Sequence, residues 1–327
     1  MPTIHRFFVV LALGAVFLSG AAATSASPPT PFAPEAPVDL APRWEEGQTA
    51  RFGFTTRLQQ AVEVTLGENR REQSTETDFA GELTWTVDQV SADGGSRCTM
   101  VLDWMSVDIR ADAGGGGPVV ESAVDSRKPA PAEQKLMHNL LRAMAGVPVA
   151  VTVAADGRVQ QIRGLDAMKA RCENPDLVPD ELDFEETASG LAAFCAAPPP
   201  LKPGGNWKAA FRWNHELGHM DEDWTYKLGP VEFLGNVPVA TITGSAKSRL
   251  EVDPEQLERP AGAPPVNIRL ADREATTQIL MDLDRREAVG RHSVATERVT
   301  VEVKLPGGVF RRVMNETDTS QLVRLTP

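Results

Sequence analysis

Hydrophobic and polar residues alternate along much of the chain, with the period of two that is typical of a half-buried β-strand. Residues 79–90 place Leu83, Trp85 and Val87 on one face, and residues 98–104 repeat the pattern after a glycine-containing turn. Further hairpins are predicted at residues 149–162 through the Asp156-Gly157 turn, at residues 277–294 and at residues 299–313. The pattern predicts a mainly β protein built from antiparallel strands.

Two segments depart from this period and predict helices. In residues 132–145, Leu136, Leu140 and Met144 fall on one helical face, which is the signature of an amphipathic helix. A second helix is predicted near residues 180–195, where a run of three prolines ends it. The predicted fold is therefore mainly β with minor α. It is an antiparallel curved sheet or two half-barrels, with one or two covering helices.

The chain contains two β-rich halves that begin in a similar way. Trp207, preceded by two glycines, opens the second half much as Trp44 and Gly47 open the first. The spacing indicates a weak internal duplication at about 140 residues, an interpretation that stays open. The predicted division is residues 1–26 as a signal peptide, 27–42 as a Pro-rich linker, 43–198 as the first half and 199–327 as the second half. We expect ordered structure from Trp44 onward.

The first residues have the order of a secretory signal. Arg6 supplies positive charge, residues 7–18 are apolar or small, and small residues follow up to Ala26. The apolar run is shorter than the roughly 20 residues of a membrane span, and no later stretch approaches that length. We expect cleavage near Ala23 or Ala26. No cysteine directly follows the apolar run, so a lipid anchor would have no attachment point. We expect an exported protein, periplasmic or extracellular, without a lipid anchor and without a membrane span in the mature chain.

Charge and cysteine content narrow the function further. The 327 residues carry a formal net charge of −12, which disfavours binding to a nucleic-acid backbone. Of three cysteines, Cys172 and Cys195 bracket one proline-broken segment and are the candidate disulfide pair, since export permits oxidation. Cys98 lies in an apolar strand and is predicted to be a small buried side chain.

One motif carries recognisable chemistry. His215 and His219 flank Glu216 in the His-Glu-x-x-His pattern of zinc peptidases, where two imidazoles on one helix face bind zinc and the glutamate activates water. The neighbouring sequence disfavours this reading, because Gly218 is a poor helix former and the following residues are β-like. No third ligand is visible nearby. The preferred interpretation is a hairpin tip without a metal or cofactor, and the alternative is a zinc-dependent metallopeptidase.

The order of several turn motifs resembles an uncharacterised family of exported bacterial β-rich proteins, known only as a domain of unknown function. The motifs are Trp44-x-x-Gly47, the Asp156-Gly157 hairpin ending in Ile162-x-Gly164, and Pro200-x-x-Pro203-Gly204-Gly205-x-Trp207 before Tyr226-x-Leu228. The likeness covers most of residues 43–327. It implies that Gly218 is a turn glycine and that the histidine pair is incidental, and it implies no catalytic residues.

A fainter likeness at the level of the fold is to periplasmic lipoprotein-carrier (LolA-like) proteins, which implies a curved sheet over an apolar concave site. Together these features predict a non-enzymatic envelope protein that binds an apolar ligand, such as a lipid, or a partner protein. A purely structural interaction protein without a ligand site is a third alternative.

Overall fold

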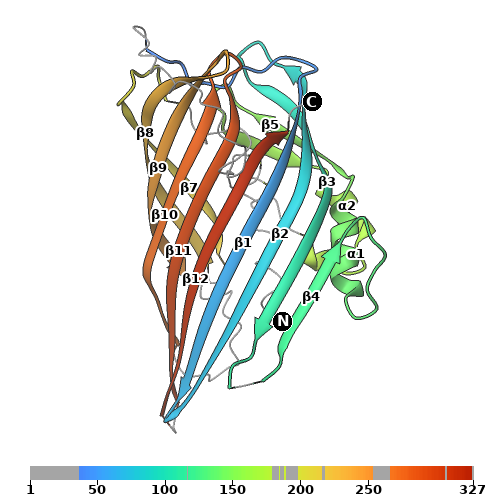
Figure 1. Cartoon of the computed structure of the whole chain (residues 1–327), viewed down its shortest axis with the longest axis vertical. Coiled ribbons are helices and arrows are strands. Elements are labelled where there is room, and N and C mark those ends of the chain that lie inside the picture. The colour runs from blue at the N-terminus through green and yellow to red at the C-terminus, as the bar shows by residue number, and fades with distance from the viewer. Residues whose placement is uncertain are drawn as a thin grey trace, which may run out of the picture.

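The structure is a computed structural model that describes residues 37–115, 117–178, 184, 188, 198–215, 218–252, 266–305 and 308–325. These residues form one twelve-stranded antiparallel sheet (Figure 1). The strands are β1 (Thr49–Leu66), β2 (Asn69–Val90), β3 (Ser96–Asp112), β4 (Val119–Asp125), β5 (Pro148–Val153), β6 (Val159–Arg163), β7 (Asn206–His215), β8 (Gly218–Leu234), β9 (Val237–Val252), β10 (Val266–Asp282), β11 (Glu287–Leu305) and β12 (Gly308–Leu325).

The strand order joins the two halves of the chain in one sheet. It runs β6-β5-β3-β2-β1-β12-β11-β10-β9-β8-β7, and β4 pairs with the free part of the β3 edge. The first described strand, β1, is therefore paired along its length with the last, β12. We refer to β1–β6 as the first wall and to β7–β12 as the second wall. The observed architecture is the single curved sheet, rather than two half-barrels.

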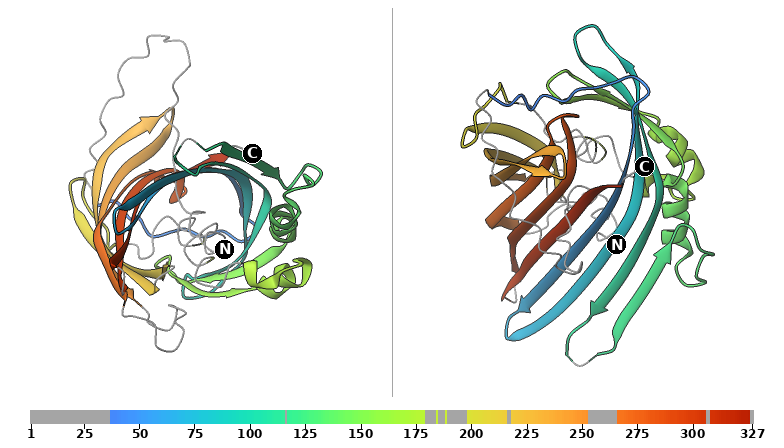
Figure 2. Two further views of the ribbon diagram at one scale, coloured as in Figure 1. Left: turned by 90° about the horizontal axis from the view of Figure 1, so that it is seen from below. Right: turned by 45° about the horizontal axis from the view of Figure 1, so that its top comes forward.

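The sheet curves so that its two walls face each other, as the end-on view in Figure 2 shows. Along β1, the even-numbered residues from Ala50 to Leu58 are buried, whereas Arg51 and Arg57 on the opposite face are exposed. This alternation is the period-two pattern of a sheet with one buried face. We call the buried, concave face the inner face and the charged, convex face the outer face.

The helices belong to the first wall. α1 (Lys135–Met144) and α2 (Leu165–Arg171) lie beside β3, β4 and β5, and a 3₁₀ turn (Pro175–Leu177) follows α2. α1 directs Leu140, Leu141 and Met144 into the core of this wall. None of the described helices is long and apolar enough to cross a membrane.

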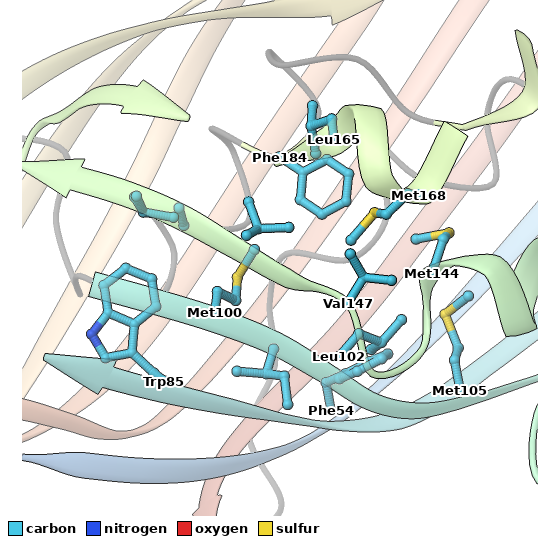
Figure 3. Close-up of a cluster of buried hydrophobic side chains, with 14 of the residues drawn as sticks. Phe54, Trp85, Met100, Leu102, Met105, Met144, Val147, Leu165, Met168 and Phe184 are labelled. Carbon is cyan, nitrogen blue, oxygen red and sulfur yellow. The ribbon is translucent and has the colours of Figure 1, made fainter. Parts of the chain in front are cut away.

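The core of the first wall is rich in aliphatic and sulfur-containing side chains. Met144 of α1, Met168 of α2 and Phe184 meet Met100 and Leu102 of β3 around a small apolar void (Figure 3). Flexible methionine side chains fill such irregular spaces between a sheet and helices. This wall is packed as an ordinary protein core.

The predictions of a mainly β antiparallel fold and of the helix near residues 132–145 are confirmed. The hairpin at residues 149–162 is also confirmed, as β5 and β6. Of the segment near residues 180–195, the structure describes Phe184 and Ala188, which are both helical and buried. α2 was not predicted from the sequence, because its seven residues are too few for a clear helical period.

Packed structure begins earlier than Trp44, the residue from which the sequence predicts order. Val38 forms a bridge with Leu201, and Leu40 is fully buried in the core of the second wall. These two apolar residues are spaced so that an extended segment directs both to the same side. Residues 1–36, which include the predicted signal peptide and most of the predicted linker, lie outside the described residues.

Candidate functional site

A band of polar side chains crosses the inner face of the second wall and ends on β1 of the first wall. In order across the sheet, this polar belt consists of Gln60, Glu316, Glu297, Arg273, Ser248 and Glu222. Directly paired residues on neighbouring antiparallel strands have side chains on the same face, so the register brings these groups together. The same face buries a second, smaller polar group, in which Arg291 and Ser293 donate to the hydroxyl of Thr277. Around these two polar groups the inner face is largely apolar.

Arg273 is the centre of the belt. Its Nε and Nη2 each lie 2.9 Å from Oε1 of Glu222, and its Nη1 donates to Oε2 of Glu297 at 3.2 Å. The two carboxyl side chains are only 7% and 3% exposed. A guanidinium with several fixed donors suits such a shared contact. Arg273 therefore balances part of the negative charge that the sheet buries here.

Glu222 has further donors on its own side of the belt. The indole Nε1 of Trp224 donates to its Oε2 at 2.9 Å, and the hydroxyl of Ser248 lies 3.4 Å from its Oε1. Both oxygens of this buried carboxylate are thus hydrogen-bonded, as burial of a charge requires.

Asp318 lies next to the belt and is less well satisfied. Its cross-strand neighbours are Leu58 and Ala295, and its Oδ1 is buried without a hydrogen-bond partner. Burial, reinforced by the nearby charge of Glu316, raises the pKa of Asp318 to about 8, against the opposing effects of Arg273 and of a hydrogen bond from Ser320. The carboxyl group is therefore largely neutral at neutral pH.

Beyond the belt, small side chains cover the middle of the second wall. Ala209, Ala246, Ala275 and Ala295 occupy one row across the strands, together with Trp224. Because alanine side chains are short, the surface of the inner face lies close to the backbone along this row. The row connects the polar belt with the aromatic and aliphatic part of the inner face.

An aromatic ladder follows this alanine row. Tyr226 stacks against Trp207 at a centroid distance of 5.1 Å and against Trp224 at 5.5 Å. Its cross-strand partner is Gly244, where a Cβ would lie 2.7 Å from the tyrosine ring. Glycine is required here because the ring lies flat over the neighbouring strand.

The buried apolar residues of the two walls do not merge into one core. One large cluster belongs to the first wall with Leu322 of β12, and another belongs to the second wall with Val38 and Leu40. A third, small cluster of Val62, Val299 and Met314 lies at the seam between β1 and its neighbours. A compact two-layer domain would normally have one contiguous core. Among the described residues, the facing inner surfaces thus remain separate.

The structure forms a hairpin at the sequence's histidine motif. β7 ends at His215, β8 begins at Gly218, and Asn214 pairs with His219. The predicted hairpin is confirmed, and the flanking residues are strands rather than the helix that the zinc-peptidase arrangement needs. Glu216 lies outside the described residues. Among the residues that are described, no group of three or more histidine, cysteine or acidic side chains is placed to hold a metal.

Two cysteines can be placed. Cys172 is buried, and its Sγ donates to the carbonyl of Asn174 at 3.2 Å. Cys195 lies outside the described residues, so its disulfide with Cys172 stays a prediction. Cys98 is buried as predicted, and burial raises the pKa of its thiol to about 11.

Sequence reasoning missed the polar belt. Arg273 and Glu297 belong to strands whose polar residues look like outer-face positions when a strand is read by itself. The sequence does contain one signal. Arg273 lies an even number of residues from Ala275 and Ile279 on the same strand, so its side chain is on the same face as these two buried residues. Recognising it requires the register between strands, which the alternation pattern does not supply.

The fold and site together define a protein with an open, curved antiparallel sheet and a largely apolar inner face crossed by charge. No family model and no curated protein matches the chain. The resemblance to an exported family is therefore not supported by a family match.

Solved structures show distant likeness in fold. A structure titled for lipid–protein interactions in lipovitellin is 10% identical, with a TM-score of 0.46, over 86% of this chain and 25% of that chain. This chain thus spans only a quarter of lipovitellin. An outer membrane channel from Pseudomonas putida F1 is 9% identical with a TM-score of 0.24, covering 86% and 97% of the two chains. A DUF1329 family protein from Desulfovibrio piger is 8% identical with a TM-score of 0.13, covering 82% and 84%.

Proposed function

We propose that the inner face of the sheet binds an apolar ligand with an extended chain, such as a lipid acyl chain. The observation that carries this proposal is the separation of the two large apolar clusters on facing walls. The residues of both clusters are at most 9% exposed, and an acyl chain on the inner face would pack against them and gain dispersion contacts. We further propose that the protein acts after export, without catalysis.

The alanine row supports a place for the ligand in the second wall. Ala275 and Ala246 are paired on neighbouring strands and are both buried on the inner face. Their small side chains keep the surface low between the belt and the aromatic ladder. An acyl chain that lies there contacts the rings of Trp224 and Tyr226, which offer large apolar surfaces.

The test fills this space with a larger apolar side chain. Ala275→Phe is expected to weaken binding of a fluorescent acyl chain by about tenfold, which corresponds to about 1.4 kcal/mol. Thr276→Phe is the matched control, because Thr276 is the next residue on β10 and is exposed on the outer face. Titration of the fluorescent probe measures the affinity, and thermal unfolding reports whether each variant remains folded.

Ala246→Phe repeats the test from the neighbouring strand in case Ala275→Phe perturbs folding. Equal affinities of both folded inner-face variants and the control would place the ligand elsewhere. Absence of any saturable binding to the unmodified protein would contradict the proposed function and favour a purely structural role.

A further inference from the structure

The chemistry around Asp318 identifies the kind of polar group that such an apolar ligand would carry. We propose that the polar belt binds the ammonium group of an amphipathic amine, with Asp318 and Glu316 as its carboxylate partners. This inference rests on the proposed function, because the apolar part of the same ligand would lie on the adjacent inner face.

The first support is the composition of the belt. Its described side chains, with Asp318, provide four carboxyl groups and one guanidinium on the inner face. Arg273 is shared between Glu222 and Glu297. This setting repels an anionic headgroup such as a carboxylate or a phosphate, and it attracts a cation.

The second support is independent of the charge and concerns Asp318 itself. Its Oδ1 is buried and has no hydrogen-bond partner, while Leu58 and Ala295 on both sides offer only apolar side chains. A buried acceptor without a donor destabilises the fold, and a charged one does so more strongly. An apolar residue at this position would avoid that cost. A ligand that donates a hydrogen bond to Oδ1 explains why an acid is present.

An ammonium group satisfies both requirements together. It donates hydrogen bonds, as Oδ1 needs, and its positive charge lowers the pKa of Asp318, so that this carboxyl group releases its proton to solvent on binding and becomes the carboxylate partner. A hydroxyl group would satisfy Oδ1 alone. A metal ion fits less well, because the described residues contain no group of three or more placed ligands.

The position of Asp318 also sets the direction of the apolar tail. Along the same row lie Ala295 and Ala275, and along the strand the next inner-face residues are Ser320 and Leu322. A chain attached to the ammonium group can therefore leave the belt across the alanine row. Ala275 and its neighbour Ala246 already belong to the apolar cluster of the second wall, which continues along this row to Trp224.

The test compares three probes of equal chain length at neutral pH: dodecylamine as the ammonium, dodecanol as a neutral probe and dodecanoate as an anion. Each displaces a fluorescent acyl chain from the full-length protein. We expect dodecylammonium to bind about tenfold or more tightly than dodecanoate, and more tightly than dodecanol. Asp318→Asn and Glu316→Gln should each lower the ammonium-to-dodecanol affinity ratio by about fivefold or more, which is about 1 kcal/mol.

Glu274→Gln is the matched control, because Glu274 adjoins Arg273 on β10 but is exposed on the outer face. It should leave the affinity ratio unchanged. Because the measured quantity is the ratio of the ammonium and dodecanol affinities, a variant that binds every apolar chain more weakly would not show the expected change. The second carboxyl variant provides an independent measurement.

The outcomes separate this inference from the proposed function. If dodecanol binds but dodecylammonium is not favoured, or if neither carboxyl variant lowers the ratio, the ammonium site is wrong and the apolar face stands. If no probe binds, both are wrong. Competition by spermidine, which has amines but no apolar tail, would indicate a free amine as the source. Binding of dodecylammonium without such competition would indicate a lipid headgroup.

Discussion

The two walls of the sheet bury their inner faces in different ways. In the first wall, α1, α2 and Phe184 pack on apolar side chains of β2, β3 and β5, and the described contacts there are almost entirely apolar. In the second wall, no described helix is present, and the inner face carries the buried contact between Arg273, Glu222 and Glu297. The first wall is packed like an ordinary protein core. The second wall combines apolar surface with a few placed polar groups, which is typical of ligand sites.

Burial alone therefore does not identify the binding face. Both walls contain fully buried side chains, such as Leu140 and Ile279. Both walls also bury charge: Asp125 of β4 pairs with the exposed Arg127, whereas in the second wall Arg273 is shared between two carboxylates that are 7% and 3% exposed. A buried charge is costly unless it is paired or serves a ligand. The following predictions test whether the division between a structural wall and a binding wall holds.

The largest effect is expected from removing the centre of the belt. Arg273→Leu leaves Glu222 and Glu297 buried without their shared cation, so it should lower the free energy of unfolding by about 3–5 kcal/mol. Chemical denaturation measures this loss. Arg57→Leu is the control, because Arg57 pairs with Asp78 on the outer face and such exposed pairs contribute about 1 kcal/mol or less. Similar losses in both variants would show that the belt is not a buried charge system.

A smaller loss is expected from the core of the first wall. Leu140 is fully buried in α1, so Leu140→Ala should lower the free energy of unfolding by about 3 kcal/mol through lost contacts and a cavity. Acyl-chain affinity of the folded variant should remain unchanged, since this wall is treated as structural. Arg142→Ala, on the exposed side of the same helix, serves as the control. Weakened binding in Leu140→Ala would extend the ligand site into the first wall.

The smallest of the three effects on stability concerns pH. Asp318 has a folded-state pKa of about 8, against an ordinary value of 3.8. Between these values the unfolded carboxyl ionises while the folded one stays neutral, so its contribution to stability is complete below pH 4 and is lost as the pH rises through about 8. Burial is the main cause of this raised pKa, the charge of Glu316 adds to it, and Arg273 and Ser320 oppose it.

Asp318→Asn removes that titration. From pH 5.5 to pH 7, its free energy of unfolding should rise relative to the unmodified protein by about 2 kcal/mol, since one proton bound in the folded state alone gives a slope of about 1.4 kcal/mol per pH unit. Unfolding curves across this range measure the difference. A parallel pH dependence in both proteins would mean that Asp318 has an ordinary pKa and is accessible to water.

Much of the fold follows from local patterns. Strand alternation and the period of residues 132–145 identify a mainly β chain with a covering helix, and Gly218 correctly indicates a hairpin in place of a zinc-binding helix. The pairing of β1 with β12 could not be predicted, because nothing local specifies which distant strand is a partner. α2 is too short to show a period.

The candidate site was less predictable than the fold. A concave apolar face was expected only from a faint likeness in fold, which identifies no residues of that face. Asp318 and Glu222 became candidates only when the register placed them on the inner face beside alanines and tryptophans. Their significance depends on burial and on missing or shared partners, which are properties of the assembled sheet.

The pairing of β1 with β12 also has a consequence for how the molecule assembles. The seam in the middle of the sheet is made from the first and last described strands, while each wall is largely built from neighbours in sequence. During synthesis, the six strands of either wall can pair locally, but the walls cannot be joined until β12 has left the ribosome. Closing so long a loop is slow, and until then β1 has an unpaired edge that is open to other chains. A chaperone that shields β1 during this interval would be expected to raise the yield of folded protein.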